Sequence, residues 1–358
     1  LRDTITSLQD KNIKLESIMS SMINGIIAID NSEKILFINH VAESLLGITG
    51  GEITGKHLLQ VVRNNSIDNY FKKMLKDKEF FNTEVNLNDS NEKILKFHAN
   101  SIKQNGENGI EGIIITIQDV TELRKLERVR TEFIANVSHE LKTPLTSIKG
   151  FTETLKSFDF DDKQDAIRFL NIIEDEADRL YRLINDILSL SELEQKKTKT
   201  LRDKIDIEKA VEEVLSVLKS QSDKKNIRLS VKIREGLDSL SGDGDKFKQM
   251  LINLIDNAVK YTPENGKVSI EAYKQSHNAD LDKLIIKVKD NGIGIPKQHI
   301  PRLFERFYRV DKARSRTIGG TGLGLAIVKH IVMLFNGEIE VTSEVGKGTE
   351  FRIILPMK

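Results

Sequence analysis

The chain of 358 residues contains no cysteine, and this absence excludes disulfides, thiolate metal sites and cysteine nucleophiles together. It also lacks an excess of charge of one sign: 55 basic and 54 acidic residues leave a formal net charge of +1, so no overall positive field indicates a nucleic-acid partner. No apolar run is long enough to cross a bilayer, and no signal peptide is recognisable. The sequence G-x-x-x-x-G-K-S/T does not occur, which excludes a P-loop nucleotide site.

The first segment of the chain carries apolar residues at alternating steps of four and three. This spacing predicts a coiled coil or signalling helix over residues 1–22, and an ordinary amphipathic helix is the alternative. The series, with one polar member, is Leu1, Ile5, Leu8, Asn12, Leu15, Met19 and Met22.

From residue 24 the pattern changes to that of strands. Five strands are expected at 25–30, 34–39, 81–87, 93–102 and 109–120, and a short helix at 41–47. A five-stranded sheet with helices on one side is a small α+β module. Together with the closing sequence DVTELR, this pattern makes residues 12–121 resemble a PAS sensor domain.

Residues 122–199 contain two long helical segments joined by the polar sequence SFDFDDKQD. Their apolar spacing predicts an all-α helical hairpin. Two helices bury little by themselves, so we expect a homodimer in which two antiparallel hairpins form a four-helix bundle. The apolar series are Leu126, Val129, Phe133, Val137, Leu141, Leu145, Ile148 and Leu155 in the first helix, and Ala166, Leu170, Ile173, Ala177, Leu180, Ile184 and Ile187 in the second.

The sequence NVSHELKTPL places a histidine beside a glutamate on the first of these helices. His139 is two residues from the nearest apolar position on either side and therefore points away from the apolar series. Glu140 and Thr143 are expected near it on the same outer face, and Pro144, which lacks an N–H, predicts a local bend. A neutral imidazole beside a carboxylate is a competent nucleophile. A solvated histidine without chemistry is the alternative.

A charged linker leads into residues 200–358, where strands and helices mix. We expect an α/β sandwich in which helices cover one face of a sheet. The strands are predicted at 227–233, 267–274, 283–290 and 348–356, and the helices at 245–262 and 322–337.

The helix predicted at 245–262 places Asn253, Asn257, Lys260 and Tyr261 on one face, opposite its apolar side. An amide oxygen such as that of Asn257 can ligate a Mg²⁺ ion that already carries triphosphate oxygens. The ammonium of Lys260, beside it, can stabilise the negative charge of the phosphates. This face is therefore a candidate for binding a nucleotide.

Glycine-containing sequences follow this helix. In DNGIGI, the Asp290 carboxylate can accept from an exocyclic amine, and Gly292 and Gly294 let a ring approach the backbone. In GGTGLG, the glycines begin a helix whose N–H groups suit phosphate, after a basic segment. Further candidate nucleotide contacts are Arg314, Gly320, Thr321, Gly322, Leu323, Gly324 and, before the last strand, Thr349.

In this order the motifs resemble those of bacterial sensor histidine kinases. NVSHELKTPL resembles the phosphoacceptor motif, and the later segments resemble the N, G1, F, G2 and G3 boxes of the ATP-binding domain shared by gyrase, Hsp90, histidine kinases and MutL. The resemblance implies ATP-dependent autophosphorylation of His139, transfer to an aspartate of a response regulator, and phosphatase activity toward that regulator through Thr143. It assigns Asn257 to Mg²⁺, Lys260 to phosphate and Asp290 to adenine.

The resemblance also carries expectations about subfamily and location. SIKGFTETL and IIEDEADRLYRLINDILSLSELE look most like the phosphate-regulon type of sensor kinase. Members of the family are usually anchored in the membrane through segments before the PAS domain, so we expect the chain to be the cytoplasmic part of a membrane protein. A small molecule or protein is expected as the signal at the PAS domain.

Three other functions stay open: a nucleotide-binding scaffold with a silent histidine, a water-hydrolysing ATPase of the gyrase or Hsp90 kind, and a module that mainly binds a PAS ligand. The complete set of motifs argues against the first. Asn253, an amide where those ATPases carry a glutamate that activates water, argues against the second. His40, His57 and His98 could bind haem in principle, although surface or hydrogen-bonding roles are expected.

Overall fold

The computed structural model describes residues 7, 14, 19, 21–48, 53–62, 67, 71, 82–87, 93–103, 110–157, 163–194, 203–234, 237, 239–277, 280–311 and 320–357. The chain divides into two compact units, 1–132 and 133–358. Most of the predicted N-terminal coiled coil, the turn of the hairpin and Arg314 lie outside the described residues. No helix within the described ranges is both long and apolar enough to cross a membrane.

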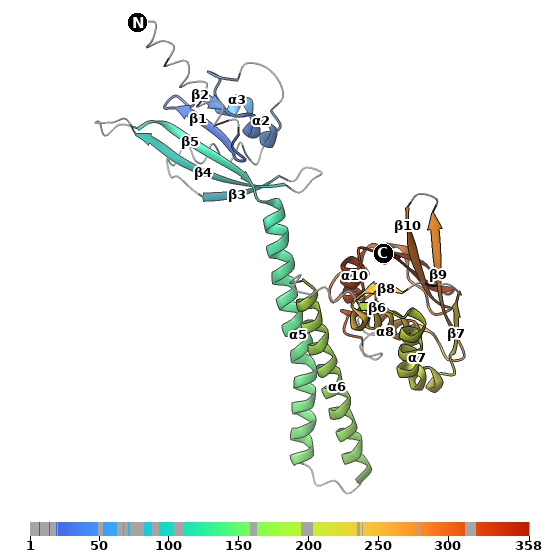
Figure 1. Cartoon of the computed structure of the whole chain (residues 1–358). Coiled ribbons are helices and arrows are strands. Elements are labelled where there is room, and N and C mark those ends of the chain that lie inside the picture. The colour runs from blue at the N-terminus through green and yellow to red at the C-terminus, as the bar shows by residue number, and fades with distance from the viewer. Residues whose placement is uncertain are drawn as a thin grey trace. The chain divides into compact units, whose positions relative to one another are not determined.

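The first unit contains the predicted five-stranded antiparallel sheet, with strand order β2-β1-β5-β4-β3 (Figure 1). Burial alternates along β1, so one face of the sheet forms a core that includes the fully buried Ile27, Phe97 and Ile115. The elements are β1 (Gly25–Asp30), β2 (Ile35–Ile38), α2 (His40–Leu46), α3 (Leu58–Val61), β3 (Asn82–Leu87), β4 (Lys93–Lys103) and β5 (Ile110–Asp119). The α+β prediction for this part of the chain is confirmed.

The three histidines considered for haem lie at the surface of this unit or bond locally. His40 and His98 are exposed. The ring of His57 accepts from the Leu59 amide at the start of α3 and lies 2.8 Å from the Glu33 carboxylate. These positions match the surface and hydrogen-bonding roles expected from the sequence.

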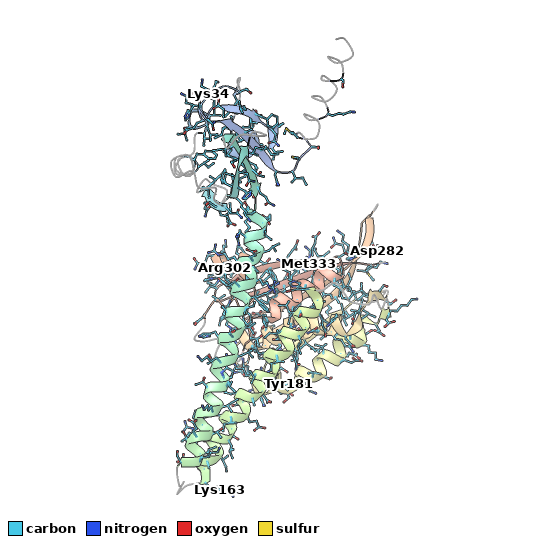
Figure 2. The ribbon with its side chains drawn as sticks, turned by 90° about the vertical axis from the view of Figure 1, so that its left-hand side faces the viewer. Lys34, Lys163, Tyr181, Asp282, Arg302 and Met333 are labelled. Carbon is cyan, nitrogen blue, oxygen red and sulfur yellow. The ribbon has the colours of Figure 1, made fainter. Side chains whose placement is uncertain are left out.

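The helical hairpin consists of α5 (Thr121–Ser157) and α6 (Lys163–Glu194), which run side by side (Figures 1 and 2). Phe151 stacks on Phe169 between them, with ring centroids 5.4 Å apart. The α5 helix continues through Pro144 for a further three turns. Several members of the apolar series remain exposed in the single chain, among them Leu145, Leu170 and Ile184. This exposure is what a hairpin that pairs with a second copy would show.

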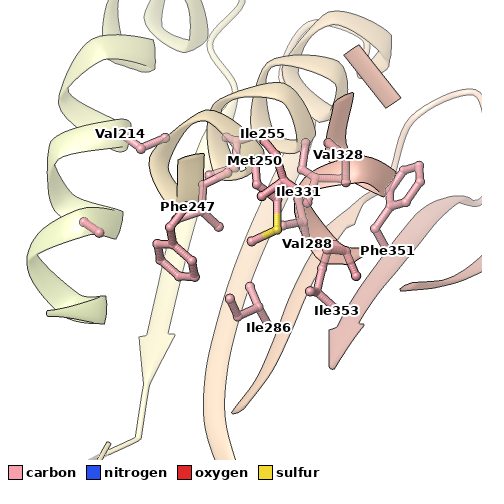
Figure 3. Packing of buried hydrophobic residues seen from close by; sticks show 14 of the residues in the cluster. Val214, Phe247, Met250, Ile255, Ile286, Val288, Val328, Ile331, Phe351 and Ile353 are labelled. Carbon is pink, nitrogen blue, oxygen red and sulfur yellow. The ribbon is translucent and has the colours of Figure 1, made fainter. Parts of the chain in front are cut away.

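The C-terminal part of the second unit contains a five-stranded sheet of order β11-β12-β10-β9-β7, in which only β7 and β9 are parallel. Helices α8 and α10 pack on one face of this sheet, with α7 beside α8 (Figure 3). The elements are β6 (Asp203–Ile205), α7 (Ile207–Lys224), β7 (Arg228–Ile233), β8 (Leu240–Gly242), α8 (Gly244–Tyr261), β9 (Lys267–His277), β10 (Asp280–Asp290), η1 (Lys297–Arg302), α10 (Gly324–Leu334), β11 (Glu338–Glu344) and β12 (Gly348–Pro356). The predicted sandwich is confirmed, whereas α7, β6, β8, β11 and η1 were not predicted.

The core of this sandwich extends into the hairpin. Leu183, Leu190 and Leu193 of α6 are buried in the same hydrophobic cluster as α8 and α10. They form a stripe different from the apolar series predicted for α6. The hairpin is therefore docked on the sandwich through its C-terminal helix.

Candidate nucleotide and phosphoacceptor site

The α8 helix orients four of the predicted nucleotide contacts. Asp243 caps its start by accepting from the amides of Asp245 and Lys246, and its apolar side is buried under the sheet. Consequently Asn253, Asn257, Lys260 and Tyr261 lie half-buried on the other face. The Asn257 side chain bonds to no residue that the structure describes, so its amide oxygen is available to a ligand. The Lys260 ammonium lies 2.5 Å from the Asp256 carboxylate.

Asp290 is buried at the end of β10, with only 7% of its surface exposed. Its Oδ1 accepts from the amides of Gly292 at 2.8 Å and Thr349 at 3.2 Å. Burial raises the pKa of this carboxyl above its ordinary value, while the two backbone N–H groups act in the opposite direction. Among the described residues none bonds to Oδ2, which therefore remains free to accept from a ligand.

The glycines after Asp290 are required by close backbone contacts. A Cβ at Gly292 would lie 2.5 Å from the Tyr261 carbonyl oxygen. Gly294 has a φ of +68°, and a Cβ there would lie 2.0 Å from the Glu344 carbonyl oxygen. The first contact places the loop against the end of α8, and the second places it against the end of β11. Predicted contacts from distant parts of the sequence therefore meet here.

The glycine-rich loop before α10 reaches the same face of α8. Among the residues that the structure describes, no side chain caps the start of α10, so its first N–H groups are available to a ligand. A Cβ at Gly324 would lie 3.1 Å from Asn253 Oδ1, and one at Gly320 would lie 3.9 Å from the Tyr261 hydroxyl. Gly322 has a φ of +76°, and the Leu323 side chain is fully buried as an anchor.

Thr321 and Thr349 have protein partners in this structure. The Thr349 hydroxyl bonds to Ser343 at 2.9 Å, which supports the Asp290 loop. The Thr321 hydroxyl donates to Asp186 of α6 at 2.7 Å. Burial raises the pKa of Asp186, whereas the Thr321 bond and the Lys260 charge lower it. A carboxylate of the hairpin thus lies in the predicted phosphate region.

His139 is exposed on α5, as predicted, but its neighbours are arranged differently from the expectation. Glu140 is turned inward, with 18% of its side chain exposed, and accepts from Arg179 of α6 at 3.3 Å and from Arg309 at 3.0 Å. Adjacent helical residues diverge by about 100°, and two largely buried guanidinium groups attract this carboxylate. No hydrogen bond joins His139 to Glu140 among the described residues. The Thr143 hydroxyl bonds to the His139 carbonyl at 3.1 Å.

Sequence reasoning missed three polar residues around this site. Asp186 and Arg179 belong to a helix that was interpreted only through its apolar series. Lys225, at the end of α7, donates to backbone carbonyls at the end of α8. None of them belongs to a glycine-rich or histidine-containing motif, so no local signal pointed to them.

The fold and the site together define a nucleotide-binding domain docked on a helical hairpin that displays a histidine. Three family models match the chain: "PAS fold" at residues 13–120, "His Kinase A (phospho-acceptor) domain" at 129–196 and "Histidine kinase-, DNA gyrase B-, and HSP90-like ATPase" at 242–358. The sensor protein kinase WalK of Staphylococcus aureus is 34% identical over 357 residues, which cover 99% of this chain and 84% of that protein. The chain belongs to the bacterial sensor histidine kinases.

Two further comparisons refine this assignment. WalK of Staphylococcus saprophyticus is also 34% identical, and the chain spans 57% of its length. The histidine kinase ThkA, solved in complex with the response regulator protein TrrA, matches 96% of this chain and 98% of its own at 26% identity and a TM-score of 0.50. The expected similarity to the phosphate-regulon type was wrong, because these curated relatives are WalK kinases. The sequences behind that expectation belong to the two hairpin helices, α5 and α6.

Proposed function

We propose that this chain phosphorylates itself on His139 with ATP and passes the phosphoryl group to an aspartate of a response regulator. One observation carries the proposal. The free face of α8, the Oδ2 of Asp290 and the uncapped start of α10 converge within a domain that is docked on the histidine-bearing hairpin. The complex of ThkA with TrrA supports a response regulator as the partner.

The residues suit ATP as the phosphoryl donor. Asp290 Oδ2 accepts from the adenine amine, while Gly292 and Gly294 keep the loop close to the ring. Lys260 and the first N–H groups of α10 stabilise phosphate charge. Asn257 offers an oxygen ligand for Mg²⁺, an ion that usually binds one or two protein oxygens together with substrate phosphates. When bound, Mg²⁺ would neutralise charge on the triphosphate.

In the transfer, a nitrogen of His139 forms a bond to the γ-phosphorus while the bond to the leaving ADP breaks. Glu140 accepts the imidazole proton. A general base must be within hydrogen-bond reach of that proton, so Glu140 has to turn away from Arg179 and Arg309 toward His139 before it can act. We further propose that Thr143 positions water for dephosphorylation of the regulator, and that two hairpins pair through their exposed apolar residues.

The remaining expectations stay predictions. These are the domain limits 1–22, 12–121, 122–199 and 200–358, a signal received by the PAS domain, and a membrane anchor outside this sequence. The roles of Arg314 and Thr349 as nucleotide contacts also stay predictions.

Incubation with γ-labelled ATP tests the proposed function. We expect protein-bound label that is labile in acid and stable in alkali, and none in His139→Gln, which should still bind nucleotide. Free labelled phosphate without protein label would favour a water-hydrolysing ATPase instead. Acid-labile label that persists in His139→Gln would show that another residue is the acceptor.

A further inference from the structure

The end of α8 is the junction at which the predicted nucleotide contacts meet. Its last turn contains Lys260 and Tyr261. The Tyr261 carbonyl accepts from the Ile293 amide at 3.3 Å, and it is the atom that a Cβ at Gly292 would strike. A displacement of this turn would therefore move Lys260, on the phosphate side of the site, together with the loop after Asp290, on the adenine side.

The last carbonyl groups of a helix need partners outside the helix, and at α8 one side chain, that of Lys225, bonds two of them and the carbonyl of the C-cap residue. The Lys225 ammonium donates to the carbonyls of Val259 at 3.0 Å, Lys260 at 2.8 Å and Thr262 at 3.3 Å. The other two carbonyls of this turn also have partners: that of Ala258 accepts from Thr262, and that of Tyr261 accepts from Ile293. An ammonium has three donors, so these three carbonyls use the whole donor capacity of Lys225.

Lys225 is itself held at a fixed point of the backbone. It is the C-cap of α7, and its amide bonds to the Ser222 carbonyl. Its own carbonyl accepts from the Asn265 amide, just before β9, at 2.9 Å. The side chain is half-buried. Lys225 thus connects three segments: the end of α7, the end of α8 and the turn into the sheet.

We propose that Lys225 is a positioning residue of the nucleotide site. Its ammonium acts as a built-in monovalent cation that holds Lys260 and Tyr261 against the Asp290 loop, without touching the nucleotide. Backbone carbonyls that converge on one cation can also replace the hydration shell of a small ion such as K⁺. If the ammonium is removed, an added ion of similar size should take its place. The inference rests on the proposed function, because ATP is the nucleotide that this site would bind.

The test is calorimetric binding of a non-hydrolysable ATP analogue, with Mg²⁺, to the full chain in LiCl, KCl or NH₄Cl of equal ionic strength. In LiCl, Lys225→Ala should bind about tenfold more weakly than wild type, the scale expected for lost hydrogen bonds to a charged group. In NH₄Cl or KCl the affinity of Lys225→Ala should return most of the way to the wild-type value. The affinity of wild type should be the same in all three salts. Lys225→Met keeps an unbranched side chain that fills the space of the lysine and leaves no room for a cation. This variant should therefore bind the analogue weakly in all three salts. Lys224→Ala, which changes the exposed neighbouring lysine, is the matched control and should behave as wild type.

A purely structural role would give other results. Wild-type affinity of Lys225→Ala in LiCl would overturn the proposal. Weak binding that no cation restores, or variants that are unfolded in every salt, would also overturn it, because Lys225 would then be a requirement of the whole domain.

Hydrogen exchange without nucleotide separates this proposal from the proposed function. We expect faster exchange in Lys225→Ala at 259–262 and 291–294, reversed by NH₄⁺. Wild-type protein that binds no analogue would refute the proposed function. The exchange result would still decide whether Lys225 holds the two segments together, and unchanged exchange would overturn that role.

Discussion

Asp290→Asn should separate nucleotide affinity from stability, because the two carboxylate oxygens face different partners. Oδ1 accepts from two backbone amides, and an asparagine oxygen can do the same. The amide nitrogen would then replace Oδ2 and present a donor to the adenine amine, which is also a donor. Loss of a hydrogen bond to a charged group is worth about 1.5–3 kcal/mol, so the dissociation constant should rise roughly 10- to 150-fold.

Stability should respond differently to the same substitution. Burial raises the pKa of Asp290 above its ordinary value of 3.8. The folded state therefore holds the proton more tightly than the unfolded state does. The free energy of unfolding then falls as the pH rises from the unfolded pKa through the folded one. Asparagine cannot ionise, so the variant should lose this decline and be at least as stable as wild type at neutral pH.

Calorimetry with an ATP analogue and denaturant unfolding at several pH values measure the two effects. Asp282→Asn is a suitable control, because it makes the same substitution on β10 at a partly exposed ion pair with Lys274. It should leave nucleotide affinity unchanged. Binding of the analogue by Asp290→Asn as tight as that of wild type would refute the proposed contact with adenine. A fall of affinity and stability together would also refute it, since Asp290 would then act only as a support of the fold.

Four further outcomes are expected. Thr143→Ala should keep most His139 labelling but lose dephosphorylation of the regulator, and equal loss of both rates would remove the separate role of Thr143. Glu140→Gln should slow labelling about 10²-fold, the scale of general acid–base assistance, while dephosphorylation persists; labelling at the wild-type rate would exclude Glu140 as the base. Asn257→Ala should abolish the Mg²⁺-dependent part of analogue binding, as seen by calorimetry with and without the metal. A fragment of residues 122–200 should be dimeric by light scattering, and a stable folded monomer at micromolar concentration would contradict the bundle.

Much of the fold could be predicted because local patterns agreed with the final packing. The strand at 25–30 was placed correctly from its apolar pattern, and the buried side of α8 follows from its helical spacing. Elements without such a pattern were missed. β6 and β8 are three residues each, and α7 carries many charged residues between its buried positions.

The candidate site could be predicted only as far as its motifs reach. Asp290 and the glycines beside it stand close in sequence, so the roles proposed for them follow from local chemistry. The direction of Glu140 depends instead on Arg179 and Arg309, which are 39 and 169 residues away. Contacts of this kind are decided by tertiary packing, and helical spacing alone cannot supply them.

The hydrogen bond from Thr321 to Asp186 makes the hairpin and the nucleotide thermodynamic competitors under the proposed function. A phosphate oxygen that takes the Thr321 hydroxyl must displace a carboxylate that accepts the same proton and carries charge of the same sign. By linkage, the factor by which the docked hairpin weakens ATP binding equals the factor by which ATP weakens docking. A signal that weakens the docking of α6 would then raise the affinity for ATP. The concentration of ATP would in turn shift the equilibrium between the docked and the undocked hairpin.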